Sequence, residues 1–221
     1  MLEVIAMTLE DARRIEAGGG ERIELVSALS EGGLTPSYGL IEAVCREVKI
    51  PVNVIVRPHS KDFVYTDEEI EMMKSDILVA KKLGANGVVI GVLNRDNTVN
   101  FQALRNLLGV CGGLDVTFHR AIDEVSDMAK VVSELAAYPE ITNILTSGGL
   151  VRPIEANTEI LKEAKSRAGH IRILLGGGLN LENVSGIKER SEATDFHFGS
   201  AVRTGGEIDV EKIRKVRAII K

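Results

Sequence analysis

Short apolar runs alternate with longer amphipathic stretches along the whole chain. The apolar runs have the length of buried strands, and the longer stretches repeat apolar residues at helical spacing. We expect strands at Leu2–Ala6, Arg22–Leu25, Val52–Val56, Gly87–Ile90, Val116–Phe118, Asn143–Leu145, Arg172–Leu175 and Asp195–Phe198. A helix is expected after each, at Thr8–Ala17, Pro36–Val48, Asp67–Leu83, Phe101–Leu108, Asp127–Ala136, Asn157–Ala168, Leu181–Glu189 and Asp209–Ile220.

Two of these helices carry recognisable start signals. Pro36 suits the first helical turn, where a missing N–H costs nothing. Thr66 followed three residues later by Glu69 predicts a capping box. Both signals support the expected helix boundaries.

Eight strand–helix units in strict alternation favour one α/β domain over residues 1–221, a single (β/α)8 TIM barrel. The alternative is a doubly wound open sheet. That fold favours a GxGxxG turn after its first strand, and none follows Leu2–Ala6. The barrel is therefore the preferred prediction.

Five of the expected strands have one apolar and one polar side. The apolar sides are Leu2/Val4, Ile23/Leu25, Val52/Val54/Val56, Val116/Phe118 and Phe196/Phe198. The polar sides are Glu3, Arg22/Glu24, Asn53/Arg57, Thr117/His119 and Asp195/His197. A barrel interior that were only a packed core would carry Val, Ile or Leu, and buried charges are costly. The pattern predicts a functional site at the mouth, where the carboxyl ends of the strands converge.

The segment DVTFHRAID, from Asp115, places an imidazole, a guanidinium and the carboxylate of Asp123 within five positions at the end of the fifth strand. Together with residues from other strands it defines a set suited to acid–base chemistry on an anion. The candidate catalytic residues are Glu3, Glu24, His119 and His197, and the candidate anion-binding cations are Arg22, Arg57 and Arg120. The alternative is an internal salt-bridge network that only orients the barrel.

Glycines follow the last strands of the chain. Backbone N–H groups of glycine-rich loops approach anions closely, and the last two loops of a barrel often hold phosphate. The candidates are Gly176, Gly177, Gly178 and Gly199, with Ser147 of the TSGG loop adding a hydroxyl. Plain turn chemistry is the alternative.

Two long loops are expected on the same side as these residues. The loop Pro58–Thr66 contains Phe63 and Tyr65, and the loop Ser27–Leu34 lies beside it. Together they could form a lid over the mouth, or they are ordinary solvated loops.

Composition narrows the range of partners. The 221 residues carry a net charge of −5 and a pI near 5.5, which argues against nucleic-acid and membrane-surface binding. No apolar run reaches the roughly 18 residues of a membrane span, and no signal peptide is expected. Two cysteines provide no disulfide framework, so a reducing cytoplasm is the expected compartment.

Metal binding is left open by the sequence. No HExxH or CxxC spacing occurs, although Glu3, Glu24, His119 and His197 could hold a divalent ion. Cu(I) prefers thiolate or thioether ligands. Cys45 is expected in a helix core and Cys111 at the end of the barrel opposite the mouth, so a shared copper site is not favoured.

Several segments match one known family in order along nearly the whole chain. They are RIELVSALSEGGLTPSYG from Arg22, VRPHSKDFVYTDEE from Val56, DVTFHRAID from Asp115, ILTSGG from Ile144, GGGLNLENV from Gly176 and FHFGSA from Phe196. These segments resemble the CutC copper homeostasis proteins. The resemblance implies a cytoplasmic TIM barrel, usually a homo-oligomer such as a dimer or tetramer, with a role in copper trafficking or tolerance and copper as a possible cofactor.

The resemblance is uneven at the places that matter for copper. Many family members carry Cys where this chain has Ile5, Val26 and Val64. The charged cleft matches at Glu3, Arg22, Glu24, Arg57, His119, Arg120, Ser147 and His197.

Three functional hypotheses remain. The first is a copper homeostasis protein that binds or responds to copper. The second is an enzyme doing acid–base chemistry on a phosphorylated or carboxylated metabolite, with His119 and Glu24 as acid and base. The third is an interaction scaffold that retains a relict pocket.

Overall fold

The chain folds into a closed barrel of eight parallel strands in sequence order. The computed structural model describes residues 1–149, 154 and 157–221. The strands are β1 (Leu2–Ala6), β2 (Arg22–Leu25), β3 (Val52–Ile55), β4 (Gly87–Ile90), β5 (Asp115–Phe118), β6 (Ile141–Thr146), β7 (Arg172–Leu175) and β8 (Asp195–Phe198). This confirms the (β/α)8 prediction and rules out the doubly wound sheet.

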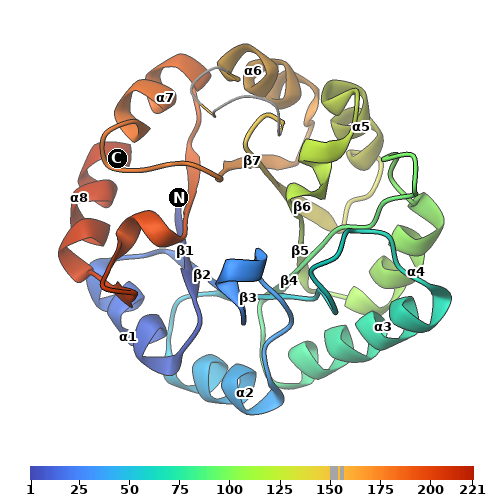
Figure 1. The fold of residues 1–221 in the computed structure, drawn as a ribbon, viewed down its shortest axis with the longest axis horizontal. Helices are drawn as coiled ribbons and strands as arrows, with labels where there is room; N and C mark the ends of the chain where they lie inside the picture. The colour runs from blue at the N-terminus through green and yellow to red at the C-terminus, as the bar shows by residue number, and fades with distance from the viewer. Residues whose placement is uncertain (150–153, 155–156) are drawn as a thin grey trace.

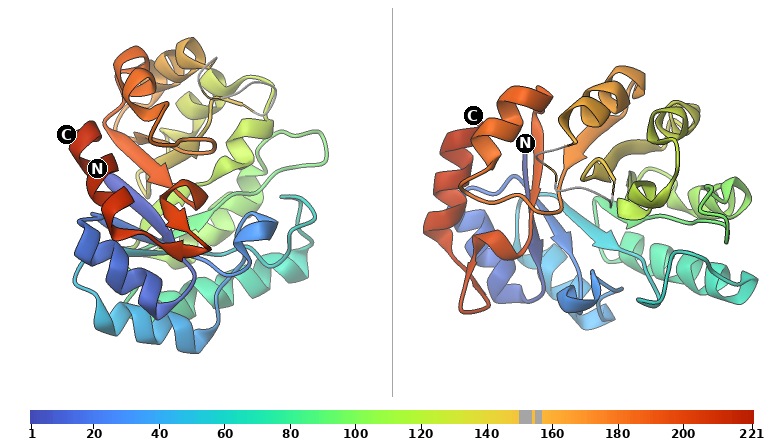
Figure 2. Two further views of the ribbon diagram at one scale, coloured as in Figure 1. Left: turned by 60° about the vertical axis from the view of Figure 1, so that its left-hand side comes forward. Right: turned by 45° about the horizontal axis from the view of Figure 1, so that its top comes forward.

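Helices surround the barrel as a ring, seen from above in Figure 1 and obliquely in Figure 2. They are α1 (Leu9–Gly18), α2 (Tyr38–Glu47), α3 (Asp67–Lys82), α4 (Phe101–Cys111), α5 (Met128–Leu135), α6 (Thr158–Arg167), α7 (Val184–Ser191) and α8 (Val210–Ile220). Shorter pieces lie in the loops: the 3-10 helices η1 (Leu29–Glu31), η2 (Arg120–Glu124) and η4 (Ser200–Val202), and a hairpin of β9 (Arg203–Thr204) and β10 (Glu207–Ile208). The hairpin and the 3-10 helices were not predicted.

Most predicted boundaries agree with the structure to within a few residues, and local capping explains the differences. The capping box of Thr66 and Glu69 at the start of α3 is confirmed. The placement of Pro36 in a first helical turn is wrong, because the Ser37 side chain caps α2 and the helix begins at Tyr38. Among helix ends, α4 runs on to Cys111 before Gly112 turns the chain away.

The start of α7 differs from the prediction by three residues, as does the end of α4. A helix was expected from Leu181, but α7 begins at Val184. The Asn180 side chain accepts the backbone N–H groups of Glu182 and Asn183, which holds residues 180–183 in a turn. This turn keeps the segment after β7 at the mouth of the barrel.

The alternation of the strands separates two kinds of packing. Outward side chains such as Val4, Ile23 and Phe196 are fully buried between the barrel and the helices. Inside the barrel, the buried side chains Ile5, Val26, Ile55 and Val89 form a small apolar cluster on β1 to β4. The remaining inward positions are largely polar, as the pattern predicted.

The register of the strands sets which inward side chains meet. Glu3 on β1 pairs with Arg22 on β2 and with His197 on β8. These neighbours close the barrel around one polar layer. Above it, η1 lies over the middle of the ring in Figure 1.

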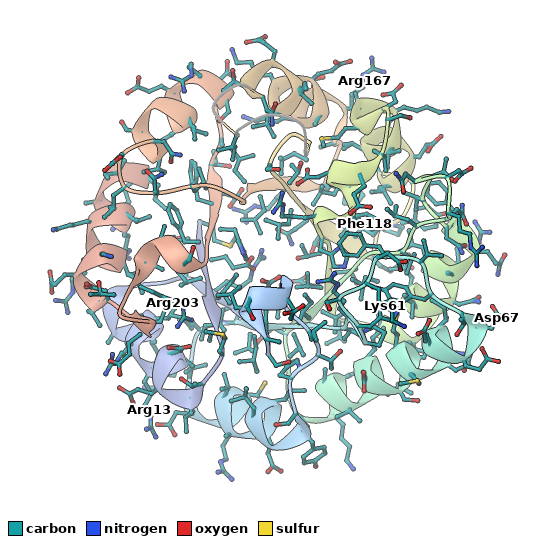
Figure 3. All side chains as sticks on the ribbon, in the orientation of Figure 1. Arg13, Lys61, Asp67, Phe118, Arg167 and Arg203 are labelled. Atoms are coloured by element: carbon teal, nitrogen blue, oxygen red, sulfur yellow. The ribbon has the colours of Figure 1, made fainter. Side chains whose placement is uncertain are left out.

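A buried ion pair fixes the chain after β8. Arg203 donates to both carboxylate oxygens of Asp11 on α1, at 2.9 and 3.2 Å, and to the carbonyl oxygen of Ile5. In Figure 3 its side chain extends from the segment after β8 toward α1. This contact anchors the loop that carries Gly199 and η4.

None of the helices in the part of the chain that the structure describes combines the length and the apolarity needed to cross a membrane.

Candidate functional site at the barrel mouth

A cavity of about 600 Å³ opens at the carboxyl ends of the strands. Eight of the predicted site residues line it: Glu24, Arg57, His119, Arg120, Gly177, Gly178, His197 and Gly199. Apolar side chains line it as well, namely Ile5, Leu29, Ile55, Phe63, Leu145, Leu179 and Ala201, and the rest of the wall comes from Glu31, Gly32, Asn180 and Ser200. Side chains from distant segments therefore converge on one concave site, which is the usual place for a ligand in this fold.

A row of charges lies beneath this cavity. Arg22 Nε donates to Glu3 Oε2 at 2.5 Å, and His197 Nδ1 lies 2.7 Å from Glu3 Oε1. Burial alone would raise the pKa of Glu3, but the Arg22 charge and the His197 contact lower it to about 2. Glu3 is therefore an ionised anchor whose two oxygens are both occupied, and neither it nor Arg22 lines the cavity.

His197 connects this row to the cavity. Burial alone would lower its pKa, but the carboxylates of Glu24 and Glu3 outweigh that effect and raise it. Its Nε2 lies 3.7 Å from Glu24 Oε2. The imidazole is thus held between two carboxylates in an environment that favours its protonated form.

Glu24 differs from Glu3 in having no hydrogen bond among the described residues, although it is only 4% exposed. Burial is the main cause that raises its pKa to about 7, and the nearby charge of Glu3 adds to it. A carboxyl group with a pKa near neutrality can both accept and release a proton under physiological conditions.

His119 is held in a single orientation at the end of β5. Its Nδ1 accepts the backbone N–H of Ala121 at 3.1 Å, so the neutral ring carries its proton on Nε2. Nε2 is buried and has no partner among the described residues. Burial, reinforced by the Arg57 charge, lowers its pKa to about 3. His119 is therefore a neutral hydrogen-bond donor at pH 7.

Close packing keeps the His119 ring in place. A Cβ atom at Gly91 would lie 2.4 Å from the imidazole, so only glycine leaves room for it. On the other side, the Phe63 ring lies with its centroid 4.7 Å from that of His119. The loop that carries Phe63 thus packs onto a lining residue of the cavity.

Arg57 holds the two long loops together. Its guanidinium donates to the carbonyl oxygens of Glu31 at 2.9 Å, Gly33 at 3.2 Å and Ser60 at 3.4 Å. It also lies 4.8 Å from the centre of the Phe63 ring. Arg57 is 7% exposed, and no carboxylate of the described chain lies within salt-bridge distance. Carbonyl oxygens and the Phe63 ring thus surround its positive charge next to the cavity, without a carboxylate in direct contact among the described residues.

Arg120 is placed by Asp123, the buried carboxylate of the DVTFHRAID segment. Asp123 accepts Arg120 Nε at 2.8 Å, and it also accepts the Ser147 hydroxyl and backbone N–H. Arg120 further donates to the Ser147 hydroxyl at 3.1 Å. A Cβ at Gly177 would lie 2.8 Å from the guanidinium carbon of Arg120, so the glycine accommodates the cation.

Besides Arg22, two further predicted anion-binding residues do not line the cavity. The Ser147 hydroxyl is engaged by Asp123 and Arg120, and it supports the loop after β6. The Gly176 N–H donates to the Thr146 carbonyl oxygen within the barrel. Both residues support the loops of the cavity wall without lining the cavity.

One group of side chains could hold a metal ion among the described residues. The candidate ligand atoms of Glu3, Glu24 and His197 lie within 4.8 Å of one another. His119, which the sequence placed in the same set, is not part of it. Oxygen and imidazole donors suit divalent ions but not Cu(I), and Arg22 next to Glu3 opposes a further positive charge.

The two cysteines are remote from this chemistry. Cys45 on α2 is partly buried, and Cys111 at the end of α4 is buried with its thiol directed at the Leu107 carbonyl. Burial raises the pKa of both thiols to about 11. Neither lines the cavity, so the donor set at the mouth does not fit Cu(I).

Comparison with known proteins decides the family. The sequence model of the CutC family matches residues 1–202. The chain belongs to the CutC family. It is 37% identical to the human protein named copper homeostasis protein cutC homolog, over 100% of this chain and 89% of that one. It is 35% identical to a CutC family protein of Xylella fastidiosa, over 100% and 87% of the two chains.

Solved structures agree with this assignment. The putative copper homeostasis protein CutC from Streptococcus agalactiae superposes with a TM-score of 0.85 at 34% identity, covering 92% of this chain and 100% of that one. Phosphoribosyl anthranilate isomerase from Thermococcus kodakaraensis superposes with a TM-score of 0.69 at 17% identity, covering 100% and 98%. At that identity the second match shows a shared fold alone.

Proposed function

We propose that this CutC family chain serves copper homeostasis by binding a small anionic molecule at the barrel mouth and transferring protons with Glu24. The observation that carries the proposal is the state of Glu24. It is a buried carboxyl with a pKa raised to about 7 by burial, and it faces a cavity without a hydrogen-bond partner among the described residues.

The charge at the mouth supports an anionic ligand. Arg57 brings a buried positive charge without a carboxylate partner in the described chain. An unpaired buried charge is costly, and a carboxylate or phosphate group would compensate it. Arg120 with Gly177, Gly178 and Gly199 adds a second place for a negative group.

The roles of the lining residues follow from their protonation states. Glu24 acts as the proton-transferring group, and the His197 charge, with Nε2 at 3.7 Å, stabilises its ionised form. His119 serves as a neutral donor through Nε2, since Nδ1 is occupied by the Ala121 backbone. Glu3 and Arg22 hold His197 in place.

The cysteines support an indirect relation to copper. Thiols with pKa values near 11 are protonated at neutral pH, and only the thiolate is a strong copper ligand. The metabolite handled at the mouth, rather than a thiolate-bound ion, would link the chain to copper.

Two measurements test the proposal. The midpoint temperature of thermal unfolding would be measured with a panel of phosphorylated and carboxylated metabolites. A true ligand should raise it, because at 100 times its dissociation constant it adds about 2.7 kcal/mol to the free energy of unfolding. Calorimetry of that ligand at pH 7 in buffers of different ionisation enthalpy should show uptake of about half a proton, because an anion near Glu24 raises its pKa further.

Matched variants make this test specific. Arg57→Met should lose the stabilisation by the anion, and Glu24→Gln should lose the proton uptake. The control Glu42→Gln, on the exposed side of α2, should change neither. If no anion stabilises the protein in an Arg57-dependent way, the proposal is wrong and the scaffold hypothesis gains support.

Direct binding of a divalent ion is the second candidate, supported by the grouping of Glu3, Glu24 and His197. Titration with Cu(II) and with Zn(II) would show site occupancy that His197→Gln removes. Cu(I) titrated anaerobically against a chelator should bind no better to this chain than to the Cys45→Ser/Cys111→Ser double variant. Copper-dependent binding that requires the cysteines would contradict our proposal.

A cytoplasmic location and assembly into homo-oligomers, a dimer or tetramer, complete the proposal. Partly buried and buried free thiols support a reducing compartment. Light scattering of the purified protein would give the oligomeric state.

A further inference from the structure

Two groups of opposite hydrogen-bonding character line the same cavity. The Glu24 carboxyl has no hydrogen bond from the described chain and lies 3.7 Å from His197 Nε2, and the buried Nε2 of His119 has no acceptor among the described residues. Native proteins pair nearly all buried polar groups, so an unpaired donor and a carboxyl group without a hydrogen bond at one cavity point to a bound molecule that pairs with both. The molecule must therefore offer a hydrogen to the Glu24 carboxylate and an oxygen or nitrogen lone pair to His119 Nε2–H.

We infer that Glu24 and His119 enolise an anionic carbonyl compound that carries a hydrogen on the carbon next to its carbonyl group. This inference rests on the proposed function, and it names the substrate class of that site. The Glu24 carboxylate takes the proton from the carbon. The electron pair of the broken C–H bond forms the C=C bond, the carbonyl π pair moves to oxygen, and His119 Nε2–H donates a hydrogen bond to the resulting enolate oxygen. Return of the proton to either carbon of the enediolate or enolate completes the cycle without any co-reactant.

The fixed tautomer of His119 suits this role. The Ala121 backbone N–H occupies Nδ1, so the ring cannot turn or accept a proton there without breaking that bond. Gly91 and Phe63 hold the ring from two sides. A preorganised neutral imidazole that polarises a carbonyl, paired with a glutamate base, is an established solution for proton abstraction next to a carbonyl in other barrels.

The surroundings of Glu24 suit a carbon acid. Apolar side chains of Ile5, Ile55 and Leu145 line the cavity near the polar groups and limit the access of water. A carboxylate in an apolar environment is a stronger base than in water. The Arg57 charge can then hold the anionic end of the molecule while the proton moves.

An alternative use of carboxylates is disfavoured by the contacts of Glu3. Glycoside hydrolysis ordinarily requires two carboxyl groups that can both reach the substrate. Both oxygens of Glu3 are engaged by Arg22 and His197, which leaves Glu24 as the accessible member of this pair. One base and one neutral donor fit enolisation better than double-carboxylate hydrolysis.

Hydrogen–deuterium exchange tests the inference directly. The full-length protein would be incubated in D2O with pyruvate, a 2-oxo carboxylate, and separately with dihydroxyacetone phosphate, a phosphorylated ketone. Proton NMR follows loss of the signal from the hydrogens next to the carbonyl. We expect exchange with at least one of the two probes at least tenfold above the rate in buffer, and the responding probe tells which anionic group the site prefers.

Variants separate chemistry from general effects. Glu24→Gln should reduce the exchange to the buffer rate. His119→Gln should reduce the protein-dependent part of the exchange, the excess over the buffer rate, about a hundredfold, the usual cost of losing one oxyanion donor. His170→Gln, at the amino end of β7 and away from the cavity, should exchange like the parent protein. Circular dichroism would confirm that each variant is folded.

Absence of exchange with both probes, or exchange that survives Glu24→Gln, overturns the inference. These outcomes are distinguishable from failure of the proposed function. If an anion still binds with Arg57-dependent stabilisation and proton uptake, the binding site stands and only the enolisation falls.

Discussion

Two buried carboxylates at the mouth of the barrel have opposite surroundings. Asp123, behind the loop after β6, accepts hydrogen bonds from Arg120, Thr146, Ser147 and Gly149. Glu24, on β2, accepts none from the described chain and has a pKa raised to about 7 by burial. The chain thus buries one acid among several hydrogen-bond donors, and the other with only the His197 imidazole beside it, 3.7 Å away.

This difference separates a structural role from a chemical one. A carboxylate that several donors satisfy stabilises the loops that supply them. A carboxyl group that is buried without donors destabilises the folded state, so its retention indicates a function. Asp123 accordingly positions Arg120, whereas Glu24 is available to a ligand.

The largest effect is expected from Asp123→Asn. The amide cannot accept all of the hydrogen bonds that reach the carboxylate, and Arg120 loses its counter-charge. Hydrogen bonds to a charged group contribute about 1.5–3 kcal/mol each, so losing two of them costs about 3–6 kcal/mol, which calorimetry would record as a fall in Tm of about 10 °C. The control Asp62→Asn in the exposed loop should change stability by less than about 0.5 kcal/mol. A loss below about 1 kcal/mol for Asp123→Asn would remove the contrast between the two acids.

Glu24→Gln should act in the opposite direction on stability. Because the folded-state pKa of Glu24 is raised to about 7, the folded form binds more protons than the unfolded chain. Its contribution is fully present below about pH 4.5 and is lost as pH rises through 7. At pH 8 the variant should be more stable than the parent by on the order of 3 kcal/mol, with little difference at pH 4.5. Urea unfolding at both pH values measures this, and a destabilised variant at pH 8 would contradict it.

His119→Gln should reveal the reverse dependence on pH. The pKa of His119 is lowered to about 3 by burial and by Arg57, so below pH 6.5 the unfolded chain binds a proton that the folded chain does not. The parent protein therefore loses stability as pH falls from 6.5 toward 3. Between pH 7 and pH 5 it should lose about 2 kcal/mol more than the variant does. Parallel slopes for the two proteins in this range would show that His119 is not held neutral.

The smallest effect is expected from the cysteines. Cys45→Ser and Cys111→Ser alter side chains that lie outside the cavity, so ligand binding at the mouth should be unchanged. Calorimetric titration of an anion into the double variant would check this. A tenfold loss of affinity would connect the thiols to the site and weaken the assignment of the chemistry to Glu24.

Much of the fold was predictable from the sequence because it depends on local patterns. Alternation of apolar and polar residues located the eight strands, and Thr66 with Glu69 located the start of α3. The loops were harder to predict, since the turn at Asn180 and the hairpin after β8 depend on local side-chain hydrogen bonds to the backbone, which the apolar–polar alternation does not reveal. Ser37 capped α2 where Pro36 was expected to begin it.

The residues that line the cavity were predictable where they are polar side chains at the ends of strands. Glu24, Arg57, His119 and His197 line one cavity, as their position at strand ends suggested. The sequence could not show that Ser147 faces Asp123 instead of the cavity. Nor could it distinguish the roles of Glu3 and Glu24, because that distinction arises from contacts across the barrel.

Infrared difference spectroscopy of the Glu24 carboxyl group tests the central claim most directly. The carbonyl stretch of a protonated acid, assigned by its absence in Glu24→Gln, would be followed from pH 4 to pH 9. We predict that this band disappears with a midpoint near pH 7, in agreement with the raised pKa. A midpoint near the ordinary value of 4.5 would show that Glu24 is satisfied or solvated, and it would contradict the role that we assign to it.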